Sequence, residues 1–209
     1  MDPNIWGPHA WTFLHNITLA YPKNPTESNK INIQKFIINM GHVLPCHKCK
    51  INFKDHLKDY PLTEKVISCR KELIEWLIDI HNCVNISNSK RVLSYTEALN
   101  ECNLETWEES GWVFLHNITF VYPTEPTGSD KNIIKKFIIY MSRVLPCKKY
   151  RIIFKACLKE YPLTDKVLTS RKNLVEWLID LHNQINLSNS KETLTYIETL
   201  NKYMKMKHK

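Results

Sequence analysis

The 209-residue chain contains one sequence pattern twice, at a constant offset of 101 positions. For example, Trp11–Thr18 returns without a gap as Trp112–Thr119. A unit of about 100 residues is a normal domain size, whereas solenoid repeats are shorter. The repeat therefore predicts two tandem domains, residues 1–101 and residues 102–209, rather than a solenoid.

Each copy reads as a set of helices, because apolar residues recur at helical spacing and prolines follow the first three segments. In the first copy the expected helices are residues 9–21, 33–44, 46–60 and 68–85, with a short fifth helix opened by a capping-box pattern at residues 94–97. The short connections favour antiparallel packing. The expected fold class is all-α, as two tandem four-helix bundles, each with a short fifth helix, packed as a pseudo-dimer.

The composition excludes several classes of protein. Only 4 glycines are present, which argues against Gly-rich phosphate loops, and no apolar run approaches the length of a membrane span. The net charge of +8 lies mostly in residues 102–209 and partly in the basic tail, residues 202–209. A basic tail can contact nucleic acid, but no recognition motif accompanies it, so a solvated terminus is expected.

The 7 cysteines form an odd set, and no secretory signal precedes them. This pattern is typical of a reducing compartment, and we expect the cytoplasm. Cys69 and Cys83 can pair with each other, pair with Cys102 or stay reduced, and the sequence does not choose among these arrangements.

Cys46 directly follows Pro45 at an expected helix start, and Cys49 comes three residues later. Unpaired backbone N–H groups and the positive end of the helix dipole favour a thiolate there. The neighbouring basic residues His47 and Lys48 also favour a thiolate. Two cysteines at this spacing can close a disulfide and cycle between dithiol and disulfide.

The alternative for this cysteine pair is one half of a zinc site, with His42 or His56 as further ligands. Zinc sites usually need a second Cys/His pair at matching spacing, and that pair is missing. We therefore expect no metal.

Two further clusters carry polar and aromatic side chains. His81 and Asn85 share one face at the end of an otherwise apolar helix, where a polar ligand would satisfy them. The alternative is a plain helix end facing solvent. Trp11 and His15 share a face of the first helix and suit a flat ring system, although core packing is the commoner use of such residues.

The three clusters follow one another within about 90 residues, as Trp6–His15, Pro45–Cys49 and His81–Asn85, with Lys90 downstream. In this order they resemble the Erv/ALR family of FAD-linked sulfhydryl oxidases, over essentially the whole first copy. The compact form resembles versions encoded by large DNA viruses, so the host cytoplasm, a viral factory or the virion is the implied location. The resemblance implies FAD contacts from Trp6, Gly7, Pro8, Trp11, His15, His81, Asn82, Val84, Asn85, Lys90 and Tyr95.

The resemblance also implies a reaction. A dithiol of a protein substrate, such as a thioredoxin-like carrier, attacks the disulfide at Cys46. Cys49 then passes two electrons to FAD, which gives them to O2 and forms hydrogen peroxide. The alternatives are a non-enzymatic helical interaction protein that retains only the scaffold, and a zinc-binding module.

The second copy departs from the pattern. It has Cys147 but Tyr150 in place of the second cysteine. Cys157 lies ten residues further along, about 15 Å at the helical rise, which is too far for a disulfide with Cys147. The second copy is therefore expected to be inactive in redox chemistry. Since it keeps the apolar scaffold positions, we expect it to serve as a built-in dimer partner and the chain to be a monomer.

Overall fold

The computed structural model describes residues 1–100 and 107–204, and within them it contains helices and no strand. The first half holds α1 (Pro3–Leu19), α2 (Glu27–Val43), α3 (His47–Asp59), the 3-10 turn η1 (Val66–Ser68), α4 (Arg70–Ser87) and α5 (Tyr95–Asn100). The second half holds α6 (Trp107–Phe120), α7 (Gly128–Val144), α8 (Lys148–Glu160), η2 (Val167–Thr169), α9 (Arg171–Ser188) and α10 (Tyr196–Met204). The expected all-α class is confirmed.

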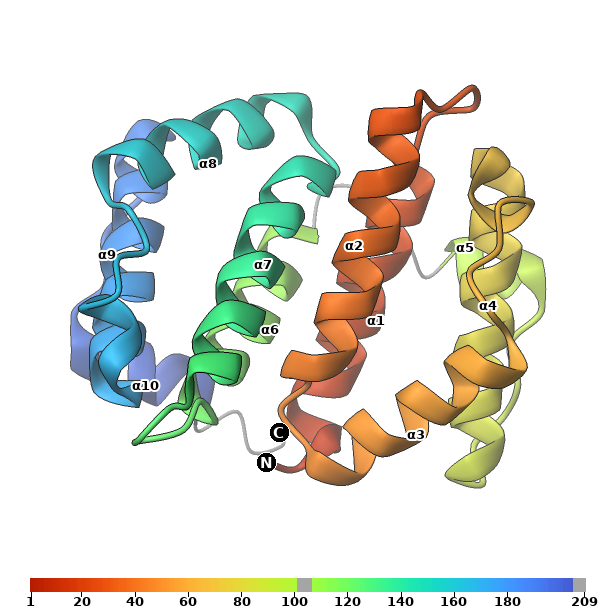
Figure 1. The fold of residues 1–209 in the computed structure, drawn as a ribbon, viewed down its shortest axis with the longest axis horizontal. Coiled ribbons are helices and arrows are strands. Elements are labelled where there is room, and N and C mark those ends of the chain that lie inside the picture. The colour runs from red at the N-terminus through yellow and green to blue at the C-terminus, as the bar shows by residue number, and fades with distance from the viewer. Residues whose placement is uncertain (101–106, 205–209) are drawn as a thin grey trace.

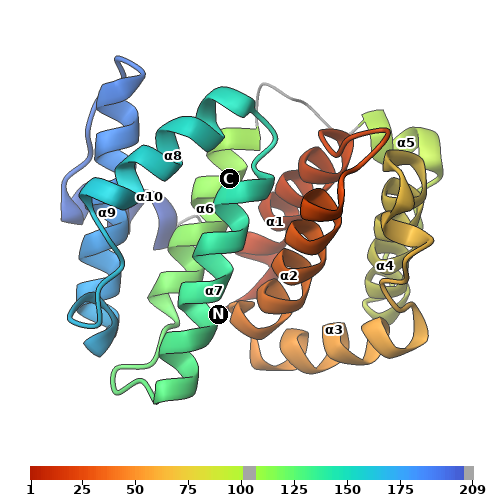
Figure 2. The same cartoon turned by 45° about the horizontal axis from the view of Figure 1, so that its top comes forward.

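The two halves pack side by side through their first two helices. Helix α1 packs against α6 and α2 packs against α7, and these four helices form the centre of the molecule (Figure 1). Helices α3 and α8 cross opposite ends of the molecule, and this arrangement holds in the turned view (Figure 2). One hydrophobic core runs through both halves. The pseudo-dimer is thus built within a single chain.

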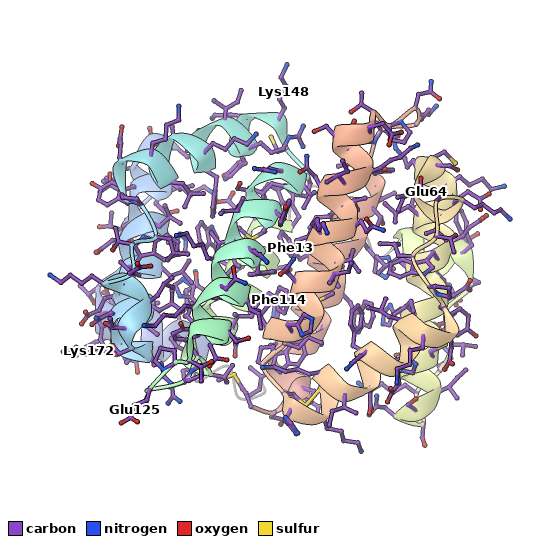
Figure 3. The ribbon with its side chains drawn as sticks, viewed as in Figure 1. Phe13, Glu64, Phe114, Glu125, Lys148 and Lys172 are labelled. Carbon is purple, nitrogen blue, oxygen red and sulfur yellow. A yellow bond between two sulfur atoms is a disulfide. The ribbon has the colours of Figure 1, made fainter. Side chains whose placement is uncertain are left out.

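Equivalent residues of the two copies meet each other at the centre. Phe36 stacks on Phe137 at 5.9 Å between ring centroids, and Phe13 lies 6.3 Å from Phe114 (Figure 3). Each partner in these pairs is 101 positions from the other. A residue can touch its own counterpart only near a two-fold axis, so a pseudo-two-fold axis passes between these rings.

Local sequence signals explain the helix ends. Thr26 and Asn29 form a capping box at the start of α2, and Ser94 and Glu97 form the one that was expected before α5. The expected start of the first helix at His9 is wrong, because α1 begins at Pro3. Asp2 caps this helix by accepting the N–H of Asn4, so the tryptophan-rich segment is helical from its beginning.

Candidate functional site

The cysteine pair lies at the N-terminus of α3, where Cys46 and Cys49 form a disulfide. Pro45 stops α2 and leaves Cys46 extended as the N-cap residue of α3. The Cys46 Sγ accepts the backbone N–H of Cys49 at 3.1 Å. A hydrogen bond and a helix N-terminus both stabilise negative charge on that sulfur, so the local fold favours a Cys46 thiolate whenever the disulfide is open.

Both cysteines open onto one cavity of about 390 Å³ between α1, α3 and α4. This volume lies within the usual range of ligand pockets. The cysteines share the cavity with most of the residues expected to contact a cofactor, namely Trp6, Gly7, Pro8, Trp11, His15, His81, Val84, Asn85 and Lys90. The structure therefore brings three separate sequence motifs to one place.

One wall of the cavity is an aromatic cluster of two buried histidines and a half-buried tryptophan. The rings of Trp11 and His81 stack at 4.0 Å, and His15 Nε2 lies 3.1 Å from His81 Nδ1. Burial lowers the pKa of His15 to about 4. Burial, followed by the nearby His15 and Lys90, lowers the pKa of His81 to about 3. The wall is thus uncharged at neutral pH, and it presents flat faces to the cavity.

Two of the residues expected to contact the cofactor, Asn82 and Tyr95, do not line the cavity. The amide of Asn82 instead holds the backbone of Leu93, donating to its carbonyl oxygen at 2.9 Å and accepting its N–H at 2.8 Å. Asn82 thereby fixes the segment between α4 and α5. Tyr95 is 41% exposed at the start of α5.

Helix α3 forms a further wall of the cavity, of which the sequence motifs indicated only the cysteine pair. Cys49, Asn52, Phe53 and His56 line it, and their spacing of three, four and seven residues places them on one helix face. This spacing, counted from Cys49, is the signal that would have found them. From the sequence, His56 was expected only in the alternative zinc site.

The lining residues suit a large, mostly flat ligand that accepts hydrogen bonds. Trp6 Nε1 and His56 Nε2 are buried, and neither has a hydrogen-bond partner among the described residues. Buried polar atoms are usually paired, so unpaired ones beside a cavity are expected where a ligand completes the site. A Cβ atom added to Gly7 would meet nothing within 4 Å, which leaves open space at that point of α1. These features fit a flavin nucleotide.

The same region of the second half is filled by side chains, and only about 20 Å³ remains. Tyr150 occupies the position of Cys49, and Glu108 occupies that of Gly7. The Tyr150 hydroxyl donates to the Glu108 carboxylate, and Lys191 Nζ lies 2.7 Å from the same carboxylate. Burial and the Glu108 carboxylate raise the pKa of Tyr150, so it remains a neutral donor. Tyr203 stacks on His116 at 4.5 Å and fills the interior.

The other cysteines of the described segments form no disulfide. Cys69, Cys83, Cys147 and Cys157 are free thiols, and burial raises the pKa of Cys157. Cys102, the other candidate partner for Cys69 or Cys83, lies outside the described residues, as do the domain junction and the end of the basic tail.

No group of three or more His, Cys, Asp or Glu side chains in residues 1–100 and 107–204 is arranged to hold a metal ion. In the same part of the chain, no helix is long and apolar enough to cross a membrane.

The sequence matches the model of the Erv1/Alr family twice, at residues 8–107 and 109–205, which fits a tandem duplication. It is 50% identical over 99 residues to a probable FAD-linked sulfhydryl oxidase of Acanthamoeba polyphaga mimivirus, covering 47% of this chain and 69% of the relative. It is 30% identical over 84 residues to the mitochondrial FAD-linked sulfhydryl oxidase of Saccharomyces cerevisiae, covering 40% of this chain and 43% of the relative. The FAD-linked sulfhydryl oxidase of African swine fever virus is 28% identical over 95 residues, covering 46% of this chain and 77% of the relative. The chain thus spans less than half of the yeast relative.

Proposed function

Since the chain belongs to the Erv1/Alr family, we propose that it is an FAD-dependent sulfhydryl oxidase, which converts protein dithiols to disulfides and reduces O2 to hydrogen peroxide. The observation that carries this proposal is the disulfide in the wall of a cavity that an uncharged aromatic cluster also lines. A dithiol oxidase needs its disulfide and its electron acceptor in contact, and a cavity that the disulfide lines supports such an arrangement.

In the proposed reaction a substrate thiolate attacks Cys46 Sγ, and the sulfur of Cys49 leaves as a thiolate. The second substrate thiol then attacks the mixed disulfide, which releases Cys46 as a thiolate and the substrate as a disulfide. The N–H of Cys49 stabilises that leaving thiolate through its hydrogen bond to Cys46 Sγ. When bound in the cavity, FAD supplies a two-electron acceptor that can be reoxidised by O2.

The roles proposed for the other lining residues follow from their chemistry. Trp11, His15 and His81 provide uncharged faces and hydrogen-bonding nitrogens for the ring systems. The Lys90 ammonium supplies positive charge for the phosphates, and Gly7 leaves room for close approach. Val84 and Asn85 complete the α4 wall, with Trp6 and Pro8 on α1. Asn82 and Tyr95 lie outside the lining, so their proposed part is to shape the segment that follows α4.

We also propose that residues 1–101 form the catalytic domain and that residues 102–209 form a degenerate domain. The closed cavity and Tyr150 support this assignment. Because α1 and α2 are already covered by α6 and α7, the chain is proposed to be a monomer. Sedimentation at several concentrations tests this: a constant monomer mass is expected, and a dimer mass would contradict the proposal.

The proposed substrate is a protein dithiol, for which a thioredoxin-like carrier is a candidate. The proposed location is the host cytoplasm, at a viral assembly site or in the virion, supported by the viral relatives. Fractionation of producing cells, with the chain detected by antibody, tests the location. Recovery of the chain in a secretory compartment would contradict it.

The activity itself is tested with the purified chain and a small dithiol. Oxygen consumption is measured together with hydrogen peroxide and the remaining thiols, and one peroxide is expected for each disulfide formed. A chain that carries FAD but consumes no oxygen with any dithiol would contradict the proposed reaction.

A further inference from the structure

We propose that Phe114, in the second copy, is a positioning residue for the FAD site of the first copy, and that it acts by holding the ring of Trp6. This inference rests on the proposed function, because it assumes that FAD occupies the cavity. It gives the inactive second copy a specific part in cofactor binding beyond covering an apolar surface.

The contact between the two rings crosses from one half to the other. Trp6 stacks on Phe114 with ring centroids 5.9 Å apart and an interplanar angle of 24°. Trp6 lines the cavity, whereas Phe114 does not line it and is fully buried. A change at Phe114 can therefore affect a ligand in the cavity only through the residues that Phe114 contacts. Among the rings that contact Phe114, Trp6 is the one that lies in the cavity wall.

The stack is what fixes the plane of Trp6. Two other tryptophans, Trp76 and Trp177, are tied to the backbone by indole N–H bonds of 2.9 Å to Tyr60 and 3.0 Å to Tyr161. Trp6 Nε1 has no such partner among the described residues. Without a hydrogen bond to set its orientation, the indole depends on packing, and an offset aromatic pair has a preferred geometry.

The pseudo-symmetry places an equivalent aromatic stack in the second half, where its surroundings differ. Phe13 stacks on Trp107 at 6.3 Å and 23°, which repeats the contact between Phe114 and Trp6. However, Trp107 lies in the filled region of the second half, with the ring of Tyr150 packed edge-on at 5.1 Å. The stack of Phe114 on Trp6 therefore supports the wall of the open cavity. The stack of Phe13 on Trp107 supports the filled region of the second half.

The two phenylalanines form a matched pair for an experiment on the full-length chain. Phe114→Leu and Phe13→Leu remove one ring each from the same interface, so similar falls in the thermal unfolding midpoint are expected. FAD affinity is measured by equilibrium dialysis of each variant against a series of FAD concentrations. Loss of one aromatic stack should weaken FAD binding by roughly fivefold in Phe114→Leu, and by less than about twofold in Phe13→Leu.

A double-mutant cycle separates a positioning role from general destabilisation. In a Trp6→Leu background, Phe114→Leu should cause no further loss of FAD affinity, because the ring through which it acts is gone. Equal FAD affinities of Phe114→Leu and Phe13→Leu, or fully additive effects of Phe114→Leu and Trp6→Leu, would overturn the inference. A wild-type chain that binds no FAD would contradict the proposed function itself, and the inference with it.

Discussion

The two halves of the molecule bury the same histidine pair in nearly the same geometry. His15 and His81 lie 3.1 Å apart in the first half, and His116 and His182 lie 3.1 Å apart in the second. A tryptophan stacks on the second histidine of each pair, at 4.0 Å and 3.8 Å. Yet about 390 Å³ of cavity adjoins the first pair, while only about 20 Å³ remains in the corresponding part of the second half.

This difference separates the residues that both halves share from those on which the open cavity depends. The histidine and tryptophan cluster persists in a closed site, so it has a packing role of its own. The cavity depends instead on a few positions that are small or sulfur-containing in the first half, such as Gly7 and Cys49, and large in the second, Glu108 and Tyr150. One half can thus share the helical fold of the other while a few side chains decide whether its cavity is open.

The largest expected effect concerns the cysteines. Cys46→Ser and Cys49→Ser should each lower dithiol-driven oxygen consumption by at least about a thousandfold, because one sulfur cannot form the intramolecular disulfide. Cys147→Ser and Cys157→Ser, in the second half, should leave it nearly unchanged. Rates are measured at equal FAD content. Substantial activity in Cys49→Ser would contradict the claim that the halves differ because only the first has the cysteine pair.

The next effect is on cofactor affinity. His81→Ala should weaken FAD binding by roughly thirtyfold, because it removes a stacked ring and leaves His15 without its partner. The matched variant His182→Ala should lower the stability of the chain and leave FAD affinity within about twofold. Equal losses of affinity in the two variants would show that the site is not confined to the first half.

Much of this arrangement could be predicted from the sequence, because it depends on local signals. Proline and capping residues mark most helix ends, and the repeat itself predicts a paired packing of two bundles. The start of α1 at Pro3 was not predicted, because a proline is unfavourable inside a helix and Pro8 lies inside α1, where Asp2 caps the helix before it.

The closure of the second cavity could not be predicted, because it depends on contacts between residues far apart in the chain. Tyr203 comes from α10 and reaches the ring of His116, and Lys191 reaches Glu108 across 83 positions. The contacts of Asn82 could not be predicted for a similar reason. Its place beside His81 in the sequence suits a ligand contact, but its side chain forms both of its hydrogen bonds with the backbone of Leu93, eleven residues away.

The histidine pairs should make a pH-dependent contribution to the free energy of unfolding, and this contribution should be equal in the two halves. Burial lowers the pKa of His81 and of His182 to about 3, whereas an unfolded histidine titrates near 6.5. Between these values the unfolded state binds more protons, so the free energy of unfolding falls as the pH falls from about 6.5 toward 3.

Each of these two histidines contributes at most about 1.4 kcal/mol per pH unit to that slope. Urea unfolding at several pH values measures it, and His81→Gln and His182→Gln should each reduce it by a similar amount. A reduction in only one variant would mean that the two pairs are not equivalent in the folded chain.

The smallest expected effect is a weak second site. Removal of the filling side chains by Glu108→Gly, Tyr150→Ala and Tyr203→Ala together should let the second half bind FAD, at least about a hundredfold more weakly than the first, since it lacks preorganised contacts. Flavin per chain at saturating FAD is the measurement, with helical content by circular dichroism as the control. A folded triple variant with no additional flavin would show that bulk alone does not close this half.

The flavin content of the wild-type chain tests the central claim most directly. Flavin released from a known amount of purified protein is counted by its absorbance after saturation with FAD and removal of the excess. One FAD per chain is predicted, because one half has an open cavity beside a disulfide and the other is filled by its own side chains. Two FAD per chain, or none, would contradict the account.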